Sequence, residues 1–63
     1  MTAAAFRAHL ARLHWSQRGL ADLLGVAHNT VHRWALDQAT IPADIAAWLE
    51  RMAALLKANP PPR

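Results

Sequence analysis

The sequence predicts an all-α protein, a single small domain of four helices spanning residues 1–58. Ala and Leu dominate the 63 residues, β-branched residues are few, and no segment alternates apolar and polar residues with the period of two that marks a strand. Apolar residues recur instead at three- and four-residue intervals, as on one face of a helix. A chain of this length has room for one small core, which self-association would help to stabilise.

The first helix is expected to begin after Thr2, whose hydroxyl can cap the first turn, and to run to about His14. One apolar stripe at positions i, i+4 and i+7 would face the core: Phe6, Leu10 and Leu13. The opposite face carries the basic residues Arg7 and Arg12.

The second helix is expected to begin at Ser16, a favourable N-cap residue, and to end at Gly25, which can adopt the left-handed conformation that terminates helices. Trp15, just before the cap, and Leu20 can pack together as a hydrophobic staple. This helix is therefore only about two turns long.

The third helix is expected to run from near His28 to about Leu36, within and just beyond the stretch GVAHNTVHRWA. Val31, Trp34 and Thr30 fall on one side of a helical wheel. The other side carries polar side chains, most of which can both donate and accept hydrogen bonds, and lacks the Glu and Lys that usually solubilise a helix: His28, Asn29, His32 and Arg33.

The fourth helix is expected over residues 42–58, with Pro42 in its first turn, and a Pro-rich tail over residues 59–63 follows it. Its apolar surface is wider than a small core requires, which predicts a homodimer interface: Ile45, Trp48, Leu49, Met52, Leu55 and Leu56. The alternative is that the many alanines on this helix only favour helix formation and do not form a partner surface.

Composition points to a polyanionic partner. The net charge is +3, and residues 1–36 hold four arginines against a single acid, Asp22, whereas the bases and acids of residues 37–63 balance. Such a basic half favours nucleic acid, although the same arginines could simply solvate the surface. The absence of cysteine, of a signal peptide and of an apolar run long enough to span a membrane predicts a cytoplasmic protein.

No cofactor, metal or small-molecule ligand is expected. His28 and His32 have a spacing that suits a metal, but two ligands are too few and no carboxylate lies at a supporting interval along the chain. The acids are scattered, Ser16 is committed to a helix cap, and the chain is too short to enclose a substrate cavity of about 300 Å³. We therefore expect no catalytic residues and no enzyme activity.

Two short helices joined by a three-residue turn containing Gly, the second with an exposed hydrogen-bonding face, match the layout of a helix-turn-helix DNA reader, here residues 16–36. The run SQRGLADLLGVAHNTVHRWALD resembles the Cro/repressor-type (XRE) helix-turn-helix family. Eleven residues fall in register with that family: Ser16, Gln17, Leu20, Ala21, Leu24, Gly25, Val26, Thr30, Val31, Arg33 and Trp34. The whole chain is also similar to the small anti-CRISPR-associated repressors of phage and mobile elements.

The resemblance implies a repressor-like domain with a tri-helical core and a dimerisation helix. It implies a transcriptional repressor that binds an inverted-repeat operator and regulates its own operon in a phage or mobile element. Its base-reading positions correspond to the polar face of the third helix: His28, Asn29, His32 and Arg33. The expected phosphate contacts are Ser16, Gln17, Arg18 and Thr30.

Two features depart from the family pattern. Ala27 stands where Ser or Thr commonly caps the third helix, and Leu36 and Asp37 follow Trp34 where Gly is common. A protein-interaction adaptor or antitoxin that presents the fourth helix to another protein is the alternative function.

Overall fold

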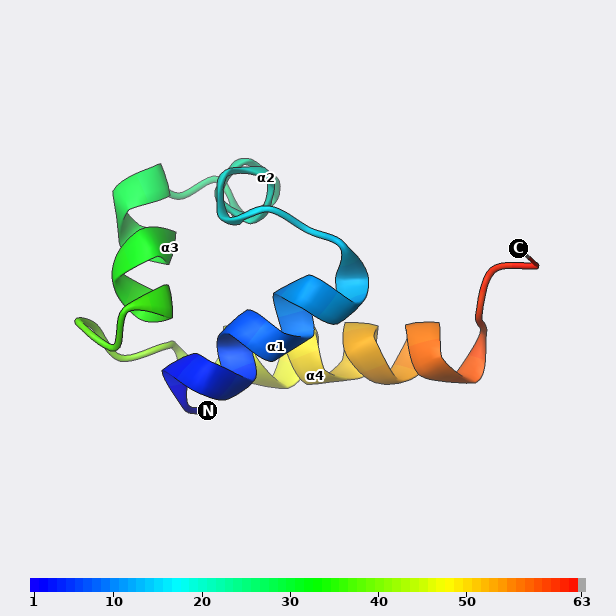
Figure 1. The fold of residues 1–63 in the computed structure, drawn as a ribbon. Coiled ribbons are helices and arrows are strands. Elements are labelled where there is room, and N and C mark those ends of the chain that lie inside the picture. Colours follow the sequence, from blue (N-terminus) through cyan, green and yellow to red (C-terminus); the bar gives the residue numbers. More distant parts are fainter. Residues whose placement is uncertain (63) are drawn as a thin grey trace.

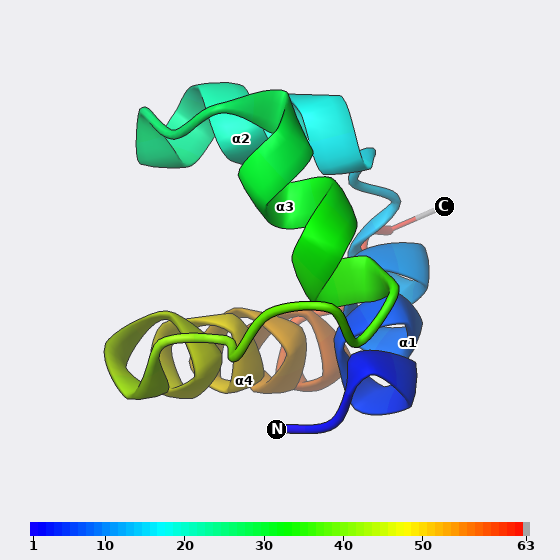
Figure 2. The ribbon, with the colours of Figure 1, turned by 90° about the vertical axis from the view of Figure 1, so that its left-hand side faces the viewer.

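The computed structural model describes residues 1–62, and within them it contains four helices and no strand. Figure 1 shows α1 (Ala3–Leu13) lying across α4 (Ala43–Ala58), with α2 (Gln17–Leu24) at the top of the view, away from α4. In Figure 2, α3 (His28–Ala35) runs from the level of α2 to the level of α1 and α4. The all-α class is thus as predicted. The predicted tail ends at Arg63, which lies outside the described residues.

Side-chain caps start the first two helices as the sequence predicts. The hydroxyl of Thr2 accepts a hydrogen bond from the amide of Ala5 at 3.0 Å, and that of Ser16 accepts one from Gly19 at 2.9 Å. Ala27 gives α3 no side-chain cap. Pro42 precedes the first turn of α4 instead of lying within it, and its carbonyl accepts from the amide of Ala46.

Left-handed residues close three turns of the chain. Gly25, with φ 71°, ends α2 as predicted. His14 (φ 57°) ends α1, and Asp37 (φ 60°) follows the end of α3. Residues with a Cβ rarely adopt this conformation, although His and Asp do so more readily than most.

The core is built of apolar side chains alone, and no buried polar side chain lies within residues 1–62. The rings of Phe6 on α1 and Trp34 on α3 meet edge to face, with centroids 6.1 Å apart and planes at 86°. Ten buried residues form one cluster: Phe6, Leu10, Leu20, Ala21, Val31, Trp34, Ala35, Ile41, Ala46 and Leu49. All four helices contribute, so one core holds them together.

Leu49 corrects one prediction. We expected this residue in a dimer interface, but its side chain is fully inaccessible in the core of the chain itself. The periodicity of α4 places Leu49 on the same broad apolar face as Met52 and Leu56. Only the packing against the other helices determines that Leu49 is buried and the other two are partly exposed.

Trp15 makes a contact that the sequence did not predict. Its ring stacks on Trp48 of α4, with centroids 5.6 Å apart and planes at 28°. The expected partner, Leu20, lines the same surface hollow as Trp15. The turn between α1 and α2 is therefore anchored to α4 across 33 residues of sequence, which restrains the position of α2.

We predict opposite stability changes at two left-handed helix ends. Gly25→Ala should lower the free energy of unfolding by about 1 kcal/mol, because no atom lies within 4 Å of an added Cβ and the cost is backbone strain alone. His14→Gly should raise it by up to about 1 kcal/mol by relieving the same strain. Urea denaturation followed by circular dichroism measures both. Equal stability of the two variants would contradict the assigned backbone conformations.

Candidate nucleic-acid interface

The two sides of α3 differ sharply in exposure. Val31, Trp34 and Ala35 are buried, with exposed fractions of 0%, 4% and 1%. Each of the four predicted base-reading residues is exposed: His28, Asn29, His32 and Arg33. Because the buried residues fix which side of α3 faces the core, the polar side chains necessarily face outward.

The turn between α2 and α3 is tight and well bonded. Gly25 donates its amide to the carbonyl of Asp22 at 3.3 Å, and Val26 donates to Ala21 at 3.0 Å. Ala21 itself is completely buried, so its small side chain allows close packing beside α3. These contacts hold α2 and α3 in a fixed relation and bring the start of α2 alongside the outer face of α3.

A shallow surface hollow of about 350 Å³ unites two predicted sets of residues. It is lined by Gln17 and Arg18 from α2 and by His28, Asn29 and His32 from α3. The two α2 residues were predicted to contact phosphates, and the three α3 residues were predicted to read bases. The remaining predicted contacts, Ser16, Thr30 and Arg33, lie outside the hollow.

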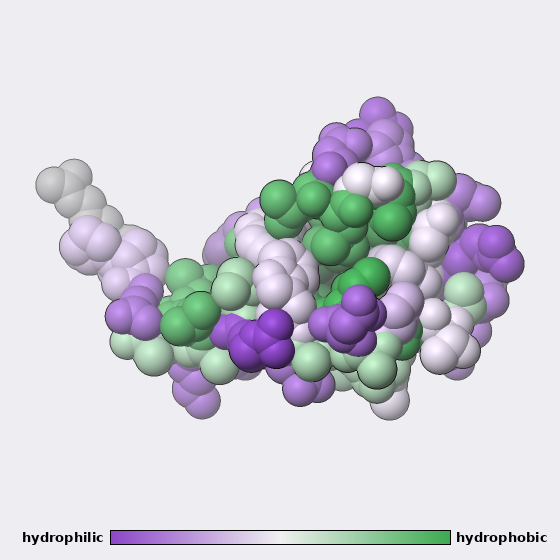
Figure 3. All heavy atoms as spheres, turned by 180° about the vertical axis from the view of Figure 1, so that it is seen from behind, coloured by the Kyte–Doolittle hydropathy of each residue, from purple (hydrophilic) through white to green (hydrophobic). Residues whose placement is uncertain are grey.

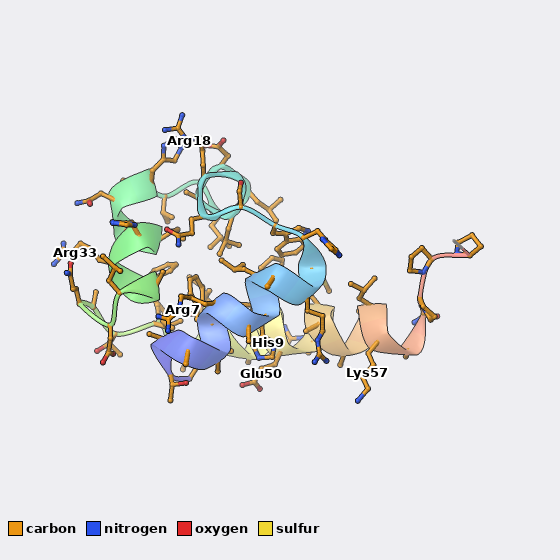
Figure 4. All side chains as sticks on the ribbon, viewed as in Figure 1. Arg7, His9, Arg18, Arg33, Glu50 and Lys57 are labelled. Atoms are coloured by element: carbon orange, nitrogen blue, oxygen red, sulfur yellow. The ribbon has the colours of Figure 1, made fainter. Side chains whose placement is uncertain are left out.

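The two arginines predicted to contact DNA project away from α4. Figure 4 shows Arg33 extending from the outer side of α3 and Arg18 from the outer side of α2, whereas Glu50 and Lys57 lie on α4 at the opposite side of the molecule. Arg18 and Arg33 are both exposed. Arg18 lines the hollow, and Arg33 lies on the same outer face of α3 as the hollow's histidines, so two positive charges face away from α4 on this side of the molecule.

Two side-chain hydrogen bonds connect α2 to the outer face of α3. His28 Nε2 lies 2.9 Å from Asp22 Oδ1, the only ion pair among residues 1–62 if the histidine is charged. His32 Nδ1 lies 3.2 Å from Gln17 Oε1. Asp22 is not at a metal-supporting interval from His28 along the chain, but it lies beside His28 in space because the turn folds α2 back beside α3.

Arg7 has a role that the sequence did not predict. Its guanidinium donates a hydrogen bond to the carbonyl of Ala35, the last residue of α3, 28 positions along the chain. Carbonyls at a helix end lack partners within the helix, and a cation there also interacts favourably with the helix dipole. Arg7 thus helps to hold the end of α3 against α1. No local spacing signals such a contact.

The predicted dimer surface is narrower than expected. Ile45 and Trp48 are partly buried and pack against the core, in addition to the fully buried Leu49. At the end of α4, Met52 and Leu56 are partly exposed and Leu55 is 54% exposed.

This end of α4 projects past α1 in Figure 1. Figure 3 shows hydrophobic atoms on this projecting end and in a larger area over the body of the molecule. Among the residues predicted for the dimer interface, the most exposed therefore lie at the end of α4, although other apolar residues outside α4, such as Leu23 (62% exposed), are also exposed.

The described residues include no group of three or more His, Cys, Asp or Glu that could hold a metal ion. His28 and Asp22 therefore stand as a pair without a third ligand. None of the helices within residues 1–62 has the length and apolar character required to cross a membrane.

Comparison of the chain with protein-family models, curated proteins and solved structures finds no match.

We predict that Arg7 stabilises α3. Arg7→Ala should lower the free energy of unfolding by about 1 kcal/mol, because the carbonyl of Ala35 loses its charged donor. Amide exchange in the last turn of α3 should accelerate. Arg12→Ala is the control, because it removes the same charge from an exposed position on the same helix and should change stability by less than about 0.5 kcal/mol. Equal effects of the two substitutions would exclude a specific role for Arg7.

Proposed function

We propose that the chain is a sequence-specific DNA-binding transcriptional regulator that represses as a homodimer on an inverted-repeat operator. The observation that carries this proposal is the outer face of α3, where four polar side chains are exposed and none is acidic. An α-helix with its side chains is about 10–12 Å in diameter, which fits the major groove of B-DNA, about 12 Å wide.

The side chains on this face suit base edges. Arg33 can donate two hydrogen bonds to O6 and N7 of guanine, and Asn29 can pair with N6 and N7 of adenine. Each such pair discriminates against a wrong base by about 1–3 kcal/mol. His28 and His32 would complete the reading surface.

Phosphate contacts would come from α2 and from Thr30. Arg18 would supply charge, and the free first amides of α2 would donate to a phosphate placed at the helix start. The hydroxyl of Ser16 already accepts a hydrogen bond from Gly19, so it would contact a phosphate by donating its own proton. Gln17 would divide its amide group between His32 and the phosphate.

In this proposal the unit of residues 16–36 is a helix-turn-helix within a repressor-like fold. Two copies of α3 would enter successive major grooves about 34 Å apart, one turn of DNA. The protein would repress by occupying a promoter, with its own operon, in a phage or mobile element, as the expected target.

The homodimer would form through the projecting end of α4. Met52, Leu55 and Leu56 form a small apolar surface there, and Ile45 and Trp48 extend it toward the body. Burying one leucine side chain is worth about 1.5–3 kcal/mol, and a twofold interface buries each residue twice.

A protein-interaction adaptor or antitoxin is the second candidate, and the exposure of Leu55 favours it. In that case the end of α4 would bind a different protein. DNA binding weakens steeply as salt rises because bound counterions are released, whereas an apolar interface does not, so the salt dependence distinguishes the two.

We predict that the protein selects one motif from a pool of random duplexes and prefers it over a scrambled duplex by about a thousandfold at about 150 mM salt. Arg33→Ala should relax the base specificity at one position of the motif. Arg18→Ala should weaken binding to both duplexes alike and flatten the salt dependence, because it removes a phosphate contact. Fluorescence anisotropy measures the affinities of all three proteins for both duplexes. Selection of no motif by the unaltered protein would overturn the proposal.

We predict that Leu55→Gln raises the dimer dissociation constant about tenfold or more, because it removes apolar surface at the end of α4. Sedimentation velocity over a concentration series measures this constant. Lys57→Gln is the matched control, because it introduces the same side chain two residues away, on another face of the helix, and should leave dimerisation unchanged. A monomer at every concentration would refute the interface.

A further inference from the structure

Asp22 is out of place on a surface proposed to face DNA. It is the only acid within residues 1–36, its side chain is 70% exposed, and it lies beside the outer face of α3. A carboxylate so close to phosphates repels them. A contact between two exposed side chains contributes little to stability, so stability alone does not account for the presence of Asp22.

The carboxylate dictates the state of His28. An ionised carboxylate has only acceptors, so the 2.9 Å contact requires that Nε2 of His28 carries the hydrogen and donates it to Asp22 Oδ1. A neutral imidazole carries one hydrogen, so its Nδ1 then offers only a lone pair. The ring is 47% exposed, and Nδ1 has no hydrogen-bond partner within residues 1–62.

His32 provides the contrast. Its partner, Gln17, can turn its amide group and present either an acceptor or a donor, so His32 remains able to offer either to a base. The carboxylate of Asp22 can only accept a hydrogen bond. The hydrogen of neutral His28 is therefore on Nε2, and Nδ1 is an acceptor; we call this arrangement the polarity of His28.

We propose that Asp22 is a specificity-determining positioning residue that makes His28 a hydrogen-bond acceptor toward DNA. This inference rests on the proposed function. An acceptor in the major groove pairs with the amino group of adenine N6 or cytosine N4, and it is repelled by the acceptors O6 and N7 of guanine and O4 of thymine. Asp22 thus selects a base that carries an amino group without touching the base itself.

The test compares motifs selected from one pool of random duplexes by the unaltered protein and by three variants. His28→Ala identifies the base position that His28 reads. Asp22→Asn keeps the shape of the side chain but can donate as well as accept, so the preference for an amino-bearing base at that same position should fall at least about tenfold. Glu50→Gln, which removes one negative charge from an exposed position on α4, should leave the motif unchanged.

An unchanged motif in Asp22→Asn, or a change at a position that His28→Ala does not affect, would overturn the inference. A uniform change in affinity without a change in base preference would also overturn it, because that result indicates a purely electrostatic or structural role. If the unaltered protein selects no motif, the proposed function itself fails.

The polarity of His28 can be tested without DNA. Long-range ¹H–¹⁵N spectra of the free protein at pH about 8, where an ordinary imidazole is neutral, should show the hydrogen of His28 on Nε2. A hydrogen on Nδ1 would refute the inference whatever the DNA experiments give.

Discussion

The packing of Trp34 against Phe6 determines how α3 is held. Both rings are almost inaccessible, and their edge-to-face contact adds about 0.5–1.5 kcal/mol to the free energy gained from burial. A helix of 8 residues is not stable alone in water, so α3 depends on this contact and on Val31 and Ala35 beside it. The direction of the polar face follows from the same burial, because a helix that buries one side must expose the other.

Features that depend on neighbours in sequence were predictable. The caps at Thr2 and Ser16, the left-handed Gly25 and the outward polar face of α3 each follow from residues within about one turn. The contacts of Arg7 with Ala35, Trp15 with Trp48 and Asp22 with His28 were not predictable, because they depend on how the helices cross. The sequence therefore identified which side chains of α3 are exposed, but it did not identify the α2 residues that position them.

The apolar surface of α4 shows a related limit. Periodicity describes the width of an apolar face but not where along the helix the rest of the protein covers it. Leu49 is buried in the core, whereas Leu55, in the last turn of α4, is 54% exposed, so two similar leucines six residues apart have opposite environments. Coverage depends on the length of α4 relative to its neighbours, a property of the assembled fold.

Two residues on the outer face of α3 take no part in the contacts that hold the fold together. Asn29 and Arg33 make no side-chain hydrogen bond to another described residue, and neither belongs to the buried core. Substitutions at these two positions therefore carry little penalty in stability. Selection can therefore change Asn29 and Arg33 while Val31 and Trp34 keep the orientation of α3, and a chain of this size can alter this surface by single mutations without first gaining stability elsewhere.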